Sequence, residues 1–132
     1  MEIIEYRTYR EEEILPLYAS VGWTAYTDAP DALRRGFEKS LLTLAAYEGK
    51  TLVGIARTVG DGETVVLVQD LLVFPQYQRL GVGTALLRAV MERFADVRQL
   101  QLVTDDTKKT LAFYHSLGLR ELSAFGCRGF MR

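Results

Sequence analysis

The order of apolar and polar residues along this chain predicts strands and helices that are interspersed. Short runs rich in β-branched and aromatic residues are typical of strands, and they lie at residues 2–9, 42–48, 51–59, 64–74 and 99–104. Apolar residues that recur every three or four positions are typical of amphipathic helices, and such segments lie at residues 11–21, 30–41, 81–97 and 107–117. Residues 119–132 are expected to hold one or two closing strands.

The run of residues 64–74, TVVLVQDLLVF, is almost continuously apolar. Such a run is typical of a central strand that is buried on both faces. With the other elements it gives the order βααββ-β-α-β-α-β. This order indicates an α/β sandwich and argues against a helical bundle or an all-β fold.

Length and composition indicate one globular domain over residues 1–132. The chain is 48% hydrophobic and 25% charged, with a formal net charge of −1. These are ordinary globular values, and no overall field favours a nucleic acid. No apolar run approaches the roughly 18 residues of a membrane helix, and the acidic N-terminus does not resemble a signal peptide. We therefore predict a cytoplasmic protein with no nucleic-acid or membrane partner.

The chain has one cysteine, Cys127, and one histidine, His115. A disulfide within the chain and a cysteine-rich or histidine-rich metal centre are therefore excluded. The neighbouring carboxylates of Asp105 and Asp106 have no third ligand near them in the sequence. We predict no metal site.

The turn between the buried strand and the helix at 81–97 is a candidate phosphate site. The strand ends at Pro75, and Gly81 and Gly83 open the helix. The first N–H groups of a helix lack partners within it and lie at the positive end of its dipole. Arg79 adds a formal charge. The alternative is a tight turn whose glycines serve packing alone. The chain has no P-loop, and Leu86 stands where the dinucleotide fingerprint requires its third glycine.

The segment Gln78-Arg79-Leu80-Gly81-Val82-Gly83 resembles the Gln/Arg-x-x-Gly-x-Gly/Ala signature of the GNAT superfamily, the acetyl-CoA-dependent N-acyltransferases. The preceding Leu71-Leu72-Val73-x-Pro75 is similar to the cofactor strand of that family. Residues 113–119 resemble its aromatic-Tyr-x-x-x-Gly-Phe segment, with Leu119 in place of phenylalanine. The resemblance implies a mixed, mostly antiparallel sheet flanked by helices. Strands 64–74 and 99–104 would splay apart to form a cleft for coenzyme A.

The resemblance also implies which residues bind acetyl-CoA. The backbone of Leu71, Leu72 and Val73 would pair with the pantetheine arm. Gln78 belongs to the signature, and the pyrophosphate would be held by the amides of Arg79, Leu80, Gly81, Val82, Gly83 and Thr84. Many family members carry an asparagine seven residues before the motif tyrosine. Thr107 stands there in this chain, and its hydroxyl can make one such contact but not two.

Tyr114 and Asp70 are the candidate catalytic residues. Tyr114 matches the usual general acid of the family, which protonates the leaving thiolate; the alternative is a tyrosine packed in the core. Asp70 lies within the apolar run, where a carboxylate is costly unless it has a partner or a role. It either accepts the proton of the amine or holds the ammonium, or it is a buried structural aspartate hydrogen-bonded to neighbouring backbone, since structural ion pairs also place charges in strands.

Trp23 and Tyr26 lie between the first two helices, in a region that forms one wall of the acceptor site in the family. Their rings would suit an amine through cation–π contact; the alternative is a core anchor for the loop. The main hypothesis is an N-acetyltransferase that transfers the acetyl group of acetyl-CoA to a primary amine of a small molecule or peptide. The alternative hypothesis is a non-catalytic acyl-CoA-binding regulatory module. The sequence does not determine the oligomeric state, and it is compatible with a homodimer.

Overall fold

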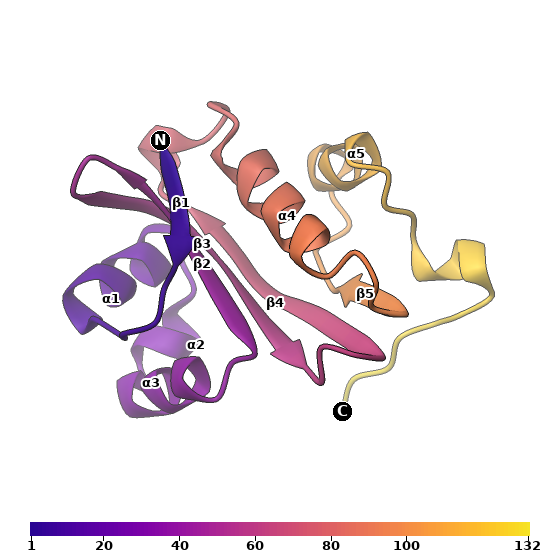
Figure 1. Ribbon diagram of the computed structural model, residues 1–132, viewed down its shortest axis with the longest axis horizontal. Helices are drawn as coiled ribbons and strands as arrows, with labels where there is room; N and C mark the ends of the chain where they lie inside the picture. Colours follow the sequence, from indigo (N-terminus) through magenta and orange to yellow (C-terminus); the bar gives the residue numbers. More distant parts are fainter.

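The computed structural model describes all residues from 1 to 132 and contains one five-stranded sheet with helices on both faces (Figure 1). The strands lie in the order β1 (Glu2–Glu5), β2 (Leu42–Glu48), β3 (Thr51–Gly60), β4 (Val65–Val73) and β5 (Gln99–Leu102). Neighbouring strands from β1 to β4 are antiparallel, whereas β5 pairs with β4 in parallel. The predicted α/β fold with a mixed, mostly antiparallel sheet is confirmed.

Five α-helices cover the sheet: α1 (Glu11–Ser20), α2 (Thr24–Thr27), α3 (Pro30–Glu38), α4 (Val82–Arg93) and α5 (Lys108–Ser116). The first three lie on one face of the sheet, and α4 and α5 lie on the other (Figure 1). Two short 3₁₀ helices, η1 (Pro75–Tyr77) and η2 (Leu122–Phe125), complete the elements. None of these helices combines the length and the apolar character that crossing a membrane requires.

Each face of the sheet buries its own apolar cluster, because successive strand residues point to opposite faces. The cluster under α1 and α3 contains Ile14, Leu17, Tyr18, Leu33, Phe37, Ala45, Leu52, Ile55 and Leu72. The cluster under α4 contains Leu44, Ala46, Val53, Ala56, Val68, Val82, Leu86, Leu87 and Val90. Burial on both faces explains why the central strands read as nearly continuous apolar runs.

The closing strand expected within residues 119–132 is not formed, and this expectation is wrong. The segment turns through η2 and continues as a tail outside the sheet. Gly126 has a φ of 72°, and its N–H closes the turn onto Ser123 O at 3.1 Å. This left-handed backbone interrupts an extended run. Phe130 and Met131 are consequently 94% and 89% exposed, and β5 is left as an edge of the sheet.

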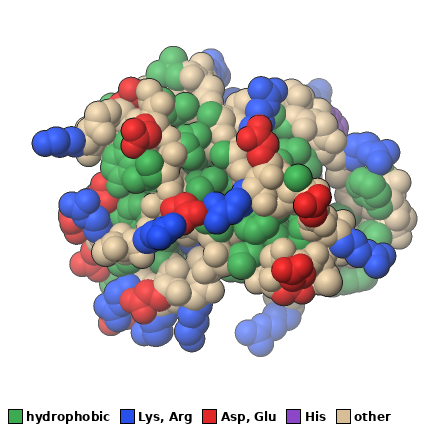
Figure 2. All heavy atoms as spheres, in the orientation of Figure 1, with side chains coloured by type: hydrophobic (Ala, Val, Ile, Leu, Met, Phe, Trp, Pro, Cys, Tyr) green, Lys and Arg blue, Asp and Glu red, His purple; other side chains and the backbone are tan.

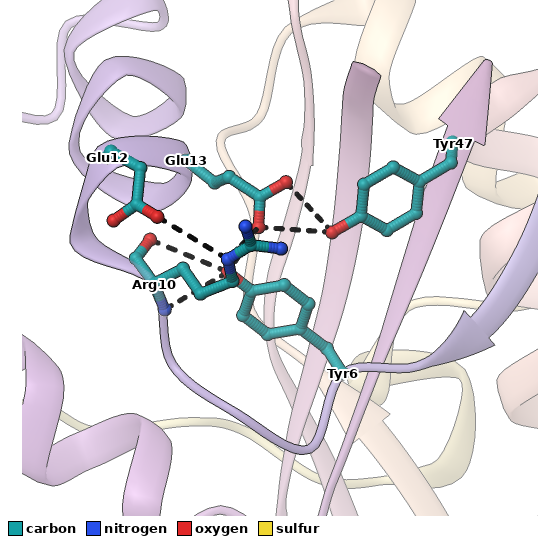
Figure 3. Close-up of polar contacts among 5 residues, drawn as sticks. All are labelled: Tyr6, Arg10, Glu12, Glu13 and Tyr47. Atoms are coloured by element: carbon teal, nitrogen blue, oxygen red, sulfur yellow. Dashed lines mark hydrogen bonds and ion pairs between the residues drawn. The ribbon is translucent and has the colours of Figure 1, made fainter. Parts of the chain in front are cut away.

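Glu13 connects the start of α1 to the sheet (Figure 3). Its carboxylate accepts hydrogen bonds from the hydroxyl of Tyr6 at 3.0 Å and from that of Tyr47 at 2.9 Å. Burial, followed by the contact with this carboxylate, raises the pKa of Tyr47 to about 12. The polar cluster therefore stabilises the neutral form of the phenol and ties β2 to α1.

The charged groups on the molecular face seen in Figure 2 are mixed in sign, with acidic and basic side chains interspersed. Ion pairs occur among the exposed charges of the molecule, such as Arg93 Nη1 with Glu5 Oε1 at 2.7 Å. This face offers no extended area of positive charge to a polyanion.

Candidate active site

A cleft opens where β4 and β5 separate. The two strands pair only between Val65–Val68 and Gln99–Leu102, whereas β4 continues to Val73 without a neighbour on that side. The cleft has a volume of about 550 Å³. Its walls include Trp23, the β4 segment from Gln69 to Val73 except Asp70, the chain that follows β5, and Tyr114 of α5. The predicted splayed strand pair is therefore present.

A bulge in β4 lies at the point where the cleft begins. Thr58 pairs with Val68 and the preceding Arg57 pairs with Asp70, so Gln69 has no partner on β3. A bulge increases the local twist of a strand and bends it. It also changes which face the following side chains occupy. Val68 belongs to the cluster under α4, whereas Asp70 reaches Tyr18 of α1 on the opposite face.

The open edge of β4 presents backbone groups to the cleft. The N–H of Phe74 donates to Val53 O on β3 at 2.9 Å. Because backbone groups alternate sides along a strand, the N–H and C=O of Leu71 and Val73 face the open edge, and those of Leu72 face β3. The Gln78 side-chain amide donates to Val73 O at 3.1 Å. All three predicted strand residues line the cleft, but Leu72 does so without free backbone groups.

The turn before α4 holds a row of backbone donors without acceptors. None of the six N–H groups from Arg79 to Thr84 donates a hydrogen bond within the protein; the next N–H, that of Ala85, donates to Gly81 O at 3.0 Å. Gly81 has a φ of 84°, and Arg79, at 64°, is the one non-glycine residue with a positive φ. Left-handed residues in a turn bring successive N–H groups together in a concave site that binds anions. These are the six residues predicted from the sequence.

The two glycines of this turn differ in what requires them. Gly81 has a left-handed backbone that other residues adopt only with strain. Gly83 has ordinary helical backbone, and a Cβ there would lie 3.6 Å from Phe113 Cζ, which is ordinary van der Waals contact. Packing within the protein therefore does not require glycine at position 83.

Tyr114 lies on α5, half-buried, and lines the cleft. Its ring packs edge-to-face on Phe113, with 5.0 Å between the ring centroids. Burial is the largest effect on its pKa and raises it above the usual 10; the nearby charge of Asp105 raises it further, and the Thr104 side chain opposes both. The phenol is therefore protonated at neutral pH, as a proton donor must be.

Asp70 does not line the cleft. Its Oδ2 accepts hydrogen bonds from the Tyr18 hydroxyl at 2.6 Å and from Arg57 Nε at 2.7 Å, and its side chain is fully buried. This carboxylate is enclosed on the α1 side of the sheet and is not part of the cleft wall. The contacts favour the structural alternative and give no support to Asp70 as a base.

Thr107 has a structural role at the start of α5. It is the N-cap of α5, and its Oγ1 accepts from Thr110 N at 3.3 Å and donates to Asp105 Oδ1 at 2.8 Å. Thr107 does not line the cleft, whereas Thr110 and Asp105 do.

Asp105 is the one charged side chain of the cleft wall. Its place in the sequence does not reveal this position, because an aspartate two residues before an N-cap is also typical of a helix entry.

Trp23 and Tyr26 form the aromatic wall on the α2 side. Their rings stack with 5.7 Å between centroids and an interplanar angle of 27°. Trp23 lines the cleft and is 37% exposed, whereas Tyr26 lies behind it and accepts a long hydrogen bond from Gln69 Nε2 at 3.4 Å.

No group of three or more His, Cys, Asp or Glu side chains comes together as metal ligands would.

Comparison with known proteins places the sequence and the fold of this chain in one family. The sequence pattern of the acetyltransferase (GNAT) family matches residues 6–119, and the chain belongs to this family of acyltransferases. Over 116 residues it is 27% identical to an uncharacterized ycf52-like N-acetyltransferase of Prochlorococcus marinus, an alignment that covers 85% of this chain and 63% of that protein. Over 84 residues it is 34% identical to the chloroplastic GCN5-related N-acetyltransferase 2 of Arabidopsis thaliana, covering 61% and 31%. The chain thus spans less than two thirds of the length of these curated relatives.

Solved structures share the fold over nearly the whole chain. A GNAT-family acetyltransferase of Streptococcus pneumoniae TIGR4 is 37% identical and superposes with a TM-score of 0.89, covering 99% of this chain and 96% of that one. The structure of AAC(6')-Iy in complex with the bisubstrate analogue CoA-S-monomethyl-acetylneamine has a TM-score of 0.77 at 18% identity, covering 99% and 95%. At that identity the likeness concerns the fold alone.

Proposed function

We propose that the protein is an N-acetyltransferase that transfers the acetyl group of acetyl-CoA directly to a primary amine of a small molecule or peptide. One observation carries this proposal: the walls of one cleft contain an open strand edge and a protonated tyrosine, and the cleft reaches Gln78, directly before the row of unpaired amides. A thioester with a pantetheine arm and a pyrophosphate requires these three features in this order.

The backbone of the site fits acetyl-CoA. The open-edge groups of Leu71 and Val73 would pair with the amides of the pantetheine arm, as an added strand does. The N–H groups from Arg79 to Thr84 would bind the pyrophosphate, and Arg79 would add a positive charge. These donors have no acceptor within the protein. The AAC(6')-Iy structures, which share the fold, contain CoA or a CoA analogue, which supports this assignment.

Tyr114 would act as the general acid. The ammonium group of the acceptor would first lose a proton to solvent. The resulting amine nitrogen then attacks the thioester carbonyl carbon, the new C–N bond forms and the C–S bond breaks. The Tyr114 hydroxyl donates its proton to the leaving thiolate and regains one from the amine through solvent. Its raised pKa keeps the proton available until it is needed.

The acceptor would approach between Asp105 and the aromatic wall of Trp23. Hydrogen bonds from the N–H and the hydroxyl of Thr107 lower the pKa of Asp105. A carboxylate with a lowered pKa is a weak base but stays ionised, so Asp105 would attract an ammonium group and would not take its proton. No Lys or Arg lines the cleft. The site therefore suits an amine without a carboxylate or phosphate of its own.

Two measurements test the proposal. Isothermal titration should show that acetyl-CoA binds, and a thiol-release assay should show turnover with cationic amines in preference to amino acids. Binding without release of thiol by any amine would instead support a non-catalytic acyl-CoA-binding module. Absence of acetyl-CoA binding would refute both functions.

A further inference from the structure

The buried ion pair between Asp70 and Arg57 has no role in the proposed chemistry. The two side chains are 0% and 8% exposed, with 2.7 Å between Arg57 Nε and Asp70 Oδ2. Arg57 also donates to Ser40 Oγ at 3.2 Å and lies over the ring of Phe37 at 5.3 Å. The second carboxylate oxygen, Asp70 Oδ1, is buried without a hydrogen-bond partner.

Stability alone does not explain this pair. Removing two charges from water is expensive, and apolar residues of similar size are often as stable or more stable at such positions. An oxygen left without a partner adds to the cost. The best-attested use of a buried polar pair is to specify one register among several that would otherwise have similar energies.

The segment of β4 after the bulge has no alternation of apolar and polar residues that would fix its register. Its residues from Leu71 to Phe74 are all apolar, and each face of the sheet has an apolar cluster to receive them. A slip of one residue exchanges the faces of all side chains, and this segment would lose little by it. Asp70 is the exception, since on the other face it would meet the apolar cluster under α4, which contains Leu86 and Val90.

We infer that Asp70 and Arg57, with Tyr18, are positioning residues that lock the register of the β4 bulge. Arg57 is paired with Asp70 across the strands immediately beside the bulge. The lock decides that the backbone groups of Leu71 and Val73 face the open edge of β4 in place of those of Leu72. It therefore selects which groups meet the pantetheine arm, a consequence that rests on the proposed function.

Tyr18 connects the Asp70–Arg57 pair to the aromatic side chains on the acceptor side of the cleft. The Tyr18 hydroxyl donates to Asp70, and its ring lies 5.3 Å from that of Tyr26 and 6.1 Å from that of Trp23. The bulge and the aromatic wall are thus held by one buried group.

The decisive variant replaces the charges by an apolar pair, Asp70→Leu with Arg57→Met. We expect a folded protein with a melting temperature at or above that of the wild type. In the wild type, the amide of Leu72 faces β3 and should exchange slowly with solvent deuterium, whereas those of Leu71 and Val73 should exchange fast. In the apolar pair this alternation should be lost, and acetyl-CoA affinity should fall at least tenfold.

The conservative variant Arg57→Lys, which keeps the buried charge beside Asp70, is the matched control and should retain most of the exchange pattern. A folded apolar pair with the wild-type pattern would refute the lock. An apolar pair that does not fold would assign the ion pair to stability and would also overturn the inference. A lost pattern with unchanged acetyl-CoA affinity would refute the effect on the cofactor. If wild-type protein fails to bind acetyl-CoA, the proposed function fails, while the exchange pattern still tests the lock.

Discussion

Replacement of Gly83 by proline removes one donor from the predicted pyrophosphate site and still allows α4 to form. Gly83 is the second residue of α4, and its N–H donates to no acceptor in the protein. Proline is tolerated in the first turn of a helix because the missing N–H has no helical partner there. The matched control is Gly83→Ala, which adds a Cβ at ordinary contact distance but keeps the N–H.

The expected loss of affinity follows from the charge of the acceptor. A hydrogen bond to a charged group contributes about 1.5–3 kcal/mol, and its loss from the complex corresponds to about a 10-fold to 150-fold higher Kd. Gly83→Ala should bind acetyl-CoA nearly as the wild type does, since the signature allows alanine at this position. It should also stabilise the protein by up to about 1 kcal/mol, because glycine is a poor helix former.

Isothermal titration of both variants with acetyl-CoA measures the difference, and thermal unfolding monitored by circular dichroism shows that both are folded at the temperature of titration. Proline disfavours helical backbone at the preceding residue, Val82, so some loss of melting temperature in the proline variant is expected. Equal Kd values for the proline and alanine variants, both folded, would show that the amide of residue 83 does not contact the ligand. The start of α4 would then lose its role as the pyrophosphate site.

Three further predictions concern the cleft and the cluster of Figure 3. Tyr114→Phe should keep its acetyl-CoA affinity and lose about 10²–10⁴-fold in kcat; a near-normal rate in the thiol-release assay would make Tyr114 a packing residue. Asp105→Asn should raise KM for a cationic amine about tenfold through the lost charge and leave the Kd of acetyl-CoA unchanged, and an unaltered KM would remove Asp105 from the acceptor site. The folded pKa of Tyr47, about 12, exceeds its ordinary 10, so its contribution to stability is complete below pH 10 and is lost as the pH rises to 12. Urea unfolding should show this decline, and Tyr47→Phe should reduce it; equal declines in both proteins would contradict the assignment.

Local signals in the sequence were sufficient to predict the unpaired N–H groups at the start of α4. A strand that ends at Pro75, followed by Gly81 and Gly83 before a long amphipathic helix, defines a helix start whose N–H groups lack partners. Those groups are unpaired in the structure as well. This part of the prediction could be made because it depends on the backbone of one continuous segment and not on distant side chains; the binding of an anion there stays a prediction.

Contacts between distant segments could not be predicted in this way. The closing strand is not formed because a strand needs a partner as well as an apolar sequence, and the left-handed backbone at Gly126 interrupts the extended run. Thr107 became the cap of α5, and Asp105 came to the cleft wall by the direction that the chain takes after β5. Neither position carries a signal that separates an N-terminal cap from a ligand contact.

Asp70 shows why the sequence of a buried strand leaves its faces undetermined. In a regular strand Asp70 would share the face of Val68, two residues earlier, and would lie under α4. The bulge at Gln69 reverses this alternation, and nothing in Val68-Gln69-Asp70 distinguishes a bulged strand from a regular one. The informative signal was a different one: a carboxylate within an apolar run requires a partner. The chain offers that partner in Arg57, the charged residue within the apolar run of β3. Two isolated charges in adjacent buried strands therefore predict a cross-strand pair, and with it the register that a purely apolar sequence would leave open.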